Sequence, residues 1–207
     1  MRKDLVILVP DIDIQSGLQG IMERNQALGI RGIPSVDFRR HVERDPGCLL
    51  RGHDFLRPFV NEYEHALVVL DRVGCGREGE TREELEGGIE VRLQAAGWDR
   101  RAAAVVIDPE IEAWVWSDSP HVDEVLGWEG RRPALREWLV GRGLLTAPDQ
   151  KPGDPKAAMV EALFEAGKAP RSASYYRELG RTVGLDRCTD PAFEKFRTTL
   201  RNWFPPR

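Results

Sequence analysis

Acidic residues stand directly after three apolar segments of the chain, at points where buried strands are expected to end. They are Asp11 and Asp13 after residues 5–9, Asp71 after residues 66–70, and Asp108, Glu110 and Glu112 after residues 103–107. Carboxylate oxygens held on a few rigid elements are the ligands that Mg²⁺ and Mn²⁺ prefer. Bound ions of this kind promote phosphoryl transfer by clamping the attacking and leaving oxygens. These residues predict a Mg²⁺ or Mn²⁺ site, and its candidate ligands are Asp11, Asp71, Asp108, Glu110 and Glu112.

Helix capping offers some of these acids a purely structural role. Asp108 precedes Pro109 and is a candidate N-cap of a helix that begins there. Glu110 would then lie in the first turn, where the positive end of the helix dipole favours an acid. Asp71 instead leads into residues 72–76, whose two glycines let the backbone approach a ligand closely. A functional role is therefore favoured at Asp71, and both roles stay open at Asp108.

Several other kinds of chemistry lack their motifs in this sequence. There is no glycine-rich loop ending in Gly-Lys-Ser/Thr, and no GxGxxG follows the first apolar segment. The four histidines form no pair on one helical face, and the three cysteines show no metal-ligand spacing. No GxSxG nucleophile elbow occurs, although sequence order alone leaves a Ser-His-Asp triad open. ATP hydrolysis of the P-loop type, Rossmann-type NAD binding and zinc chemistry are disfavoured.

The elements that must hold the acids alternate along the first half of the chain. The three apolar segments are typical of strands buried on both faces. Helical patterns follow the first two, and the second carries a capping box, Thr81 with Glu84. An extended segment near residues 33–42 and a helix near residues 55–63 fill the gap between them. We predict an α/β fold with a parallel sheet of about four strands, whose carboxyl ends line the functional crevice.

Helical patterns replace strand patterns after residue 108. Asp154-Pro155 and Asp190-Pro191 each place a capping acid before a proline, and Ser172 is expected to cap a helix that ends at Gly184. We predict an α/β domain over residues 1–118 and a helical extension over residues 119–207 that packs on it. Core residues of the extension are expected to include Trp138, Met159, Leu163, Phe164, Phe193, Phe196 and Trp203. Tryptophans at helical positions are more typical of a core than of a base-stacking surface.

Composition fits a folded protein outside the membrane. Of 207 residues, 41% are hydrophobic and 31% charged, and no apolar run approaches the roughly 20 residues that span a bilayer. Residues 5–9 are too short for a signal-peptide core, so a cytoplasmic protein is expected. The net charge of −4 is uneven, because residues 168–207 carry nine basic and four acidic side chains. A basic tail on an acidic body indicates phosphate and metal binding together, or else solvated faces of opposite sign.

Two acidic segments give the chain its resemblance to a known family. Residues 69–71 with the glycine loop behind them, and residues 108–114 followed by Ser117 and Asp118, resemble the TOPRIM-like proteins. The likeness is greatest to small bacterial members linked to phage defence, which are relatives of the TOPRIM half of OLD-type nucleases. More narrowly, the chain is similar to fourth components of the methylation-associated defence system, a multi-gene locus that pairs a DNA methyltransferase with restriction-like factors. Residues 151–156, 172–175 and 183–186 also look similar.

The resemblance implies a TOPRIM-like (Rossmann-like) parallel sheet and a Mg²⁺ site that cuts or rejoins nucleic acid. The family's first-strand glutamate would fall near Asp11, and its Asp-x-Asp motif would begin at Asp71. The chain departs from the family at Val73, which occupies the place of the second aspartate. Glu78 or Glu80 would then have to supply the missing oxygen, and Asp108, Glu110 or Glu112 would supply further acids.

Two hypotheses follow from these residues. In the first, the protein is a Mg²⁺- or Mn²⁺-dependent nuclease in a defence system, with Asp11, Asp71 and Glu112 as catalytic metal ligands. Its phosphate contacts would be Lys151, Lys156, Arg171 and Arg177, and DNA and other defence subunits would be its partners. In the second, it is a catalytically inactive TOPRIM-derived recognition or scaffold subunit, and Val73 is the main sequence evidence for that alternative.

Overall fold

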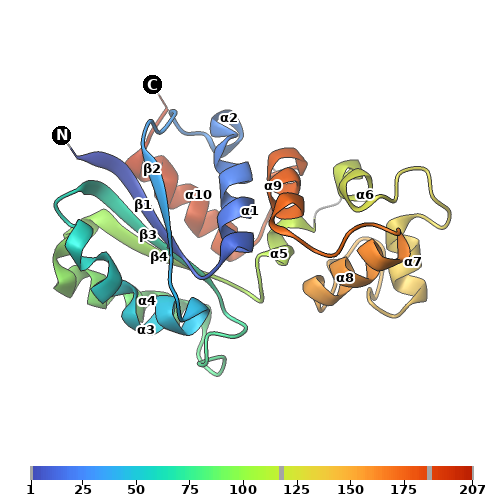
Figure 1. The fold of residues 1–207 in the computed structure, drawn as a ribbon, viewed down its shortest axis with the longest axis horizontal. Coiled ribbons are helices and arrows are strands. Elements are labelled where there is room, and N and C mark those ends of the chain that lie inside the picture. The colour runs from blue at the N-terminus through green and yellow to red at the C-terminus, as the bar shows by residue number, and fades with distance from the viewer. Residues whose placement is uncertain (1, 117–118, 186–187, 207) are drawn as a thin grey trace.

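A parallel β-sheet of four strands, in the order β2-β1-β3-β4, forms the centre of the protein in a computed structural model (Figure 1). The structure describes residues 2–116, 119–185 and 188–206. All three pairs of neighbouring strands are parallel. The strands are β1 (Lys3–Val9), β2 (Val36–Arg40), β3 (Tyr63–Asp71) and β4 (Ala102–Ile107). The predicted α/β class and four-stranded parallel sheet are confirmed.

Helices cover both faces of the sheet and extend beyond the carboxyl ends of its strands (Figure 1). Helices α3 and α4 lie on one face, α1 and α10 lie on the other, and α5 to α9 lie past the strand ends. The helices are α1 (Ile12–Met22), α2 (Asn25–Leu28), α3 (Arg44–Leu56), α4 (Arg82–Leu93), α5 (Glu112–Val115), α6 (Pro120–Leu126), α7 (Leu135–Gly141), α8 (Pro155–Glu165), α9 (Ala173–Thr182) and α10 (Pro191–Trp203). None of the helices within the described ranges is long and apolar enough to span a membrane.

Burial of the strands on both faces explains their apolar sequences. In β1, Val6 and Leu8 belong to the core under α3 and α4, whereas Leu5, Ile7 and Val9 belong to the core under α1 and α10. All five side chains are fully buried. Successive residues of a strand point to opposite faces, so a sheet covered on both sides requires a continuous apolar run.

Three predicted helix caps and the core tryptophans are confirmed. Thr81 and Glu84 form the capping box of α4, with the Thr81 N–H donating to Glu84 Oε2 at 2.8 Å. Asp154 caps α8 and Asp190 caps α10. The tryptophans are core residues, because each one is buried or packs against the core.

Other local expectations were wrong, each for a packing reason. The helix expected at residues 55–63 is α3, which begins at Arg44 because its buried face runs from Gly47 to Leu56. No helix begins at Pro109, since its carbonyl oxygen accepts the Val73 N–H at 3.2 Å, and α5 starts at Glu112. Phe164 is 82% exposed, because it points about 100° away from buried Leu163 on α8.

The helix expected to end at Gly184 ends at Thr182, and Ser172 precedes it without donating or accepting a capping bond to its backbone. The domain boundary proposed at residue 118 falls on residues 117–118, outside the described ranges, as do Ser117, Asp118 and Asp186 of the resemblance. That boundary stays a prediction.

Two glutamates of α4 close the outer edge of the sheet. Glu86 Oε1 accepts the Val106 N–H at 2.9 Å, and Glu90 Oε1 accepts the Ala104 N–H at 3.1 Å. Both N–H groups belong to β4, whose outer side faces no further strand in the described sheet. Glu86 is 3% exposed and also binds Arg82 and Lys195, so it joins α4, β4 and α10. An edge strand is thereby covered rather than left open to pair with another chain.

Replacing Glu86 with alanine is expected to lower the free energy of unfolding by about 2 to 4 kcal/mol. The change would leave the buried Val106 N–H without its acceptor and would remove one of the two acid partners of Arg82 and of Lys195. Urea unfolding followed by circular dichroism measures this. Glu83→Ala is the matched control, because Glu83 also binds Arg82 but is exposed. Equal losses in the two variants would contradict the role given to Glu86.

Helix α9 of the C-terminal part meets α1 with backbone against backbone. A Cβ atom on Gly20 would lie 2.2 Å from the Arg177 carbonyl oxygen, and one on Gly180 would lie 2.5 Å from the Gly17 carbonyl oxygen. Real side chains do not approach that closely, so both positions require glycine. This contact fixes α9 beside the carboxyl end of the sheet (Figure 1).

Gly180→Ala is expected to destabilise the fold by about 1 to 3 kcal/mol, because the added methyl group forces α1 and α9 apart. Gly87→Ala in α4 is the matched control, since a Cβ there meets nothing within 4 Å. Alanine at that position is expected to stabilise the helix by up to about 1 kcal/mol. The measurement is the Tm of each variant compared with that of the unchanged protein. An unchanged Tm in Gly180→Ala would refute the close contact of α1 and α9.

Candidate functional site

Acidic residues meet at the carboxyl edge of the sheet because all four strands run the same way. Every strand contributes at least one acid, either at its end or within a few residues of it. We call this set the acidic edge, and it consists of Asp11 and Asp13 after β1, Asp45 after β2, Asp71 at the end of β3, and Asp108, Glu110 and Glu112 after β4. The structure thus brings the predicted metal ligands to one edge and adds Asp45 to them.

Asp71 is one of the buried acids of the acidic edge. Its side chain is 8% exposed, and its Oδ1 atom is buried without a hydrogen-bond partner. Burial raises the pKa of Asp71 well above its usual range, and the charges of Asp45, Glu112, Glu110 and Asp11 raise it further. A buried carboxylate among like charges resists ionisation unless a cation neutralises it.

Asp45 lies against Asp71 in the first turn of α3. Its Oδ1 accepts the Asp71 backbone N–H at 2.9 Å. Burial raises the pKa of Asp45 to about 6, and the charge of Asp11 contributes, although the hydrogen bond from Asp71 acts in the opposite direction. A negative charge on Asp45 therefore makes ionisation of Asp71 less favourable.

Glu112 is 1% exposed and is held by two residues that come from the C-terminal part of the chain. Its Oε1 accepts hydrogen bonds from the Tyr176 hydroxyl and from Arg171 Nη1, the latter at 3.3 Å. Arg171 Nη1 also binds Asp13 Oδ2 at 2.9 Å. The second oxygen, Oε2, is buried without a partner. Burial raises the pKa of Glu112 despite the hydrogen bond from Tyr176.

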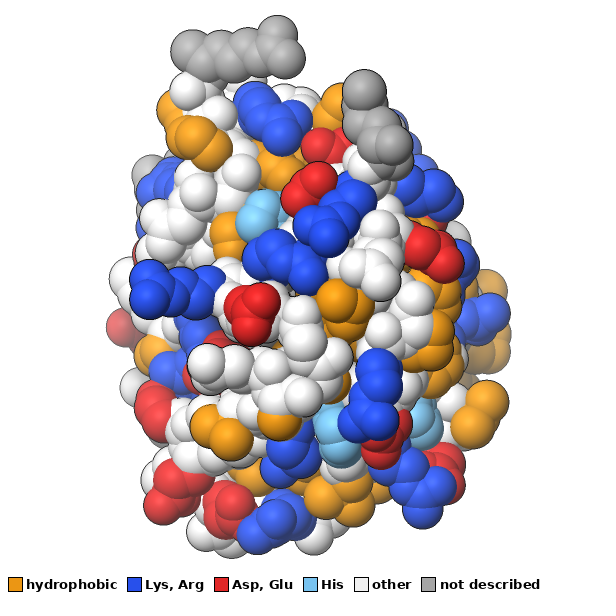
Figure 2. Space-filling model, turned by 90° about the vertical axis from the view of Figure 1, so that its left-hand side faces the viewer, with side chains coloured by type: hydrophobic (Ala, Val, Ile, Leu, Met, Phe, Trp, Pro, Cys, Tyr) orange, Lys and Arg blue, Asp and Glu red, His pale blue; other side chains and the backbone are white. Residues whose placement is uncertain are grey.

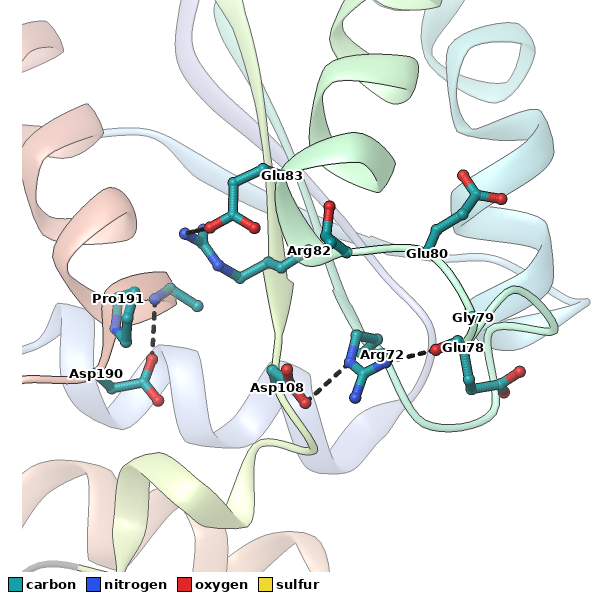
Figure 3. Close-up of a pocket in the computed structure, with 11 residues that line it drawn as sticks. Arg72, Glu78, Gly79, Glu80, Arg82, Glu83, Asp108, Asp190 and Pro191 are labelled. Atoms are coloured by element: carbon teal, nitrogen blue, oxygen red, sulfur yellow. Dashed lines mark hydrogen bonds and ion pairs between the residues drawn. The ribbon is translucent and has the colours of Figure 1, made fainter.

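Asp108 and Glu110 are neutralised by different bases. Lys156 Nζ lies 2.7 Å from Glu110 Oε1, whereas Arg72 Nε lies 2.9 Å from Asp108 Oδ1. Asp108 faces a separate pocket of about 550 Å³ between the starts of α4 and α10. Figure 3 shows Asp108 and Arg72 pointing toward one another, while Asp190 lines the same pocket from the start of α10. Asp108 therefore belongs to the rim of the acidic edge.

Three of the four predicted phosphate-binding cations lie at the acidic edge, and each already has a protein partner. Lys151 Nζ donates to the Ala113 carbonyl oxygen, while Lys156 and Arg171 bind the acids described above. Arg177 lies elsewhere, because it binds Glu23 at the end of α1 at 2.6 Å. Phosphate binding by these residues would require an exchange of partners.

Several basic side chains of residues 168–207, the basic tail of the sequence, form ion pairs with acids of the first half of the chain. Four of its described cations bind acids from the first half of the chain, namely Arg171 with Asp13 and Glu112, Arg177 and Arg181 with Glu23, and Lys195 with Glu86 and Glu90. On the face that Figure 2 shows, basic side chains are scattered among acidic ones rather than gathered in one patch. The uneven charge of the sequence therefore acts largely within the molecule.

The acidic edge fits a divalent cation in part. Among the residues that the structure describes, no three Asp, Glu, His or Cys side chains stand together closely enough to hold a metal ion. Asp11 already uses Oδ1 to cap α1, accepting the Asp13 N–H at 2.9 Å and the Ile14 N–H at 3.0 Å. The unpartnered oxygens of Asp71 and Glu112 are nevertheless what a bound cation would satisfy.

The residues proposed to replace the aspartate missing at Val73 lie within their own loop. Val73 is 46% exposed. Glu78 Oε1 accepts the Gly74 N–H at 2.9 Å and the Gly76 N–H at 3.2 Å, and Glu80 binds Arg77. Both carboxylates thus support the glycine loop that follows Asp71.

Sequence reasoning missed Asp45 and Tyr176. Asp45 could have been found by applying the strand-end rule to the extended segment near residues 33–42, which is β2. Nothing in the sequence separates buried Tyr176, which binds Glu112, from its less buried neighbour Tyr175.

A scan against protein-family models, a search of curated proteins and a search of solved structures found no significant match to this chain. The α/β fold is known from the structure, and the TOPRIM-like resemblance stays a prediction.

Stability is expected to fall as the pH rises from about 4 to about 6. The pKa of Asp45 is about 6 in the folded state and near 3.8 when exposed, so the folded state binds the extra proton throughout that window. Asp45→Asn removes this effect while its side-chain oxygen can still accept the Asp71 N–H. Its gain in Tm over the unchanged protein should be larger at pH 7.5 than at pH 4. Asp54→Asn, at the exposed end of the same helix, is the control, and a gain independent of pH would contradict the assignment.

Proposed function

We propose that the protein is a Mg²⁺- or Mn²⁺-dependent nuclease. The observation that supports this most is a pair of buried carboxylate oxygens at the acidic edge. One belongs to Asp71 and the other to Glu112, and neither has a hydrogen-bond partner. Nucleic acid cleavage needs a cation held by acids beside bases that can bind phosphate. The acidic edge has both, because Lys151, Lys156 and Arg171 reach it from the C-terminal part.

In this proposal Asp11, Asp71 and Glu112 hold the cation, with Glu110 and Asp108 beside them. A bound Mg²⁺ or Mn²⁺ supplies charge stabilisation on the oxygens of the scissile phosphate. The chain itself orients the substrate. Lys156 and Arg171 would exchange their carboxylate partners for phosphate oxygens, and Tyr176 would keep Glu112 in place through its hydroxyl hydrogen bond.

The TOPRIM-like resemblance supports the biological setting that we propose. The protein would act in a methylation-associated, restriction-like bacterial defence against phage, in the cytoplasm and together with other subunits of the locus. The four-stranded parallel sheet is compatible with that family, and so are the acids after β1, β3 and β4.

A second candidate is a recognition or scaffold subunit without catalysis. Two observations favour it, namely that no three metal-ligating side chains of the described residues stand together, and that exposed Val73 replaces an acid. The acids and bases of the edge would then serve to neutralise one another and to hold the extension on the sheet.

Asp71→Asn is expected to abolish cleavage of plasmid or single-stranded nucleic acid in Mg²⁺ or Mn²⁺, because it removes the charge of the buried ligand. Purified protein is assayed alone and with its co-expressed partner subunits, and the loss should exceed about 100-fold. Asp54→Asn, on an exposed helix end, should leave cleavage unchanged. Absence of cleavage by the unchanged protein with every ion and partner would refute the nuclease, and retained binding of nucleic acid or partners would then support the scaffold.

A further inference from the structure

The two outer strands of the sheet, β2 and β4, differ in how their free sides are covered. The free side of β4 is closed, because Glu86 and Glu90 of α4 accept two of its backbone N–H groups. Strand β2 has β1 on one side and, in the described sheet, no strand on the other (Figure 1). A strand left open in this way is a template for pairing with another chain.

The open side of β2 carries the backbone groups of every second residue. The Leu5 N–H donates to the Ser35 carbonyl oxygen at 3.1 Å, and the His41 N–H donates to the Val9 carbonyl oxygen at 3.0 Å. Residues 35, 37, 39 and 41 therefore turn their backbone groups toward β1, because these groups alternate in direction along a strand. The residues whose groups face outward are Val36, Phe38 and Arg40. No hydrogen bond joins these groups to another residue that the structure describes.

The side chains of β2 divide between the two faces of the sheet. Val36 and Phe38 pack against the core under α1 and α10, and they line a groove of about 280 Å³ between β2 and α1. Asp37 and Arg39 lie on the opposite face, on the side of α3 and α4. Arg39 lies 5.7 Å from the centre of the Phe59 ring, and within the described ranges it forms no ion pair. One face thus offers apolar side chains and the other offers charges.

The sequence of β2 complements itself when two copies run antiparallel. With Phe38 opposite its own copy, Asp37 lies opposite the partner's Arg39, and Arg39 lies opposite the partner's Asp37. Opposite charges at directly facing positions stabilise a strand pair. Moving the centre by one residue would place Asp37 opposite Asp37, or Arg39 opposite Arg39, and like charges repel there. The charges therefore select this register over both of its neighbours.

We propose that the β2 strands of two copies pair antiparallel and join two four-stranded sheets into one of eight strands. The same surface is used by both copies, so the assembly closes at a dimer. The outward backbone groups bind those of the partner, and the two Phe38 rings meet beside the grooves. A different protein would not require this strand to complement itself, so the sequence of β2 favours a second copy as the occupant.

Sedimentation velocity of the full chain over a dilution series tests the dimer. The unchanged protein is expected to form a dimer that dissociates on dilution. Arg39→Glu should raise the dissociation constant at least about tenfold, because it turns two attractive charge pairs into repulsive ones. Arg100→Glu is the matched control, since it makes the same change of charge at an exposed residue before β4 and should leave the dissociation constant unchanged.

Mixing two variants tests the register itself. Asp37→Lys copies should not pair with one another, because a lysine would then face Arg39, and Arg39→Glu copies should fail to pair for the corresponding reason. An equal mixture of the two should form a heterodimer, since every facing pair then has opposite charges. Circular dichroism melts first establish that both variants are folded, because Asp37 also binds Lys3 at 2.7 Å.

A monomer at every concentration would overturn the inference and would assign the open side of β2 to an extended segment of another protein. A dimer that Arg39→Glu leaves unchanged would also overturn it, because the dimer would then use a different surface. Failure of the two folded variants to pair in the mixture would show that the register is wrong. If Asp37→Lys does not fold, the comparison of Arg39→Glu with Arg100→Glu decides alone.

Discussion

Repulsion among acids at the carboxyl edge of the sheet is the constraint on which the rest of the structure depends. Parallel strands bring their ends together, so the acids that follow them cannot avoid one another. Three of these side chains, Asp71, Glu110 and Glu112, are buried, where Coulomb repulsion is least screened. Such an edge folds only if bases, hydrogen bonds or protons offset the charge, and the C-terminal part supplies most of the bases.

The C-terminal part of the chain therefore supplies basic side chains that offset the acids, and its helices also cover the carboxyl edge of the sheet. Arg171 reaches two acids from separate loops, and Lys156 reaches a third. The position of Arg171 depends on the close contact of α1 and α9, because a wider separation of these helices would draw Arg171 and Tyr176 away from Glu112. The glycines of that contact are thus needed for the ion pairs that Arg171 forms at the acidic edge. The same argument explains why a chain with a net charge of −4 carries a basic tail.

The central strands were predictable because burial on both faces leaves an unmistakable apolar run. Strand β2 has only partly buried residues, so its end was located loosely and Asp45 was overlooked. The capping acids of α8 and α10 were predictable because a cap depends on local sequence alone. Ion pairs such as Arg171 with Asp13 join residues 158 positions apart, and no local pattern encodes that distance. The base that pairs with each acid could not be assigned from the sequence for the same reason.

Strand order is the remaining information that sequence does not carry, and it decides which of the acids become neighbours. A central β1 makes Asp11 a neighbour of Asp45 and Asp71, although 26 residues separate the latter two. An outer β4 places Asp108, Glu110 and Glu112 where Arg72, Lys156 and Arg171 can reach them. The bases that reach the acidic edge offset the charges of Asp13, Asp108, Glu110 and Glu112. Within the described residues Asp45 and Asp71 form no ion pair, and burial raises the pKa of both carboxyl groups, so retained protons rather than bases reduce the repulsion there.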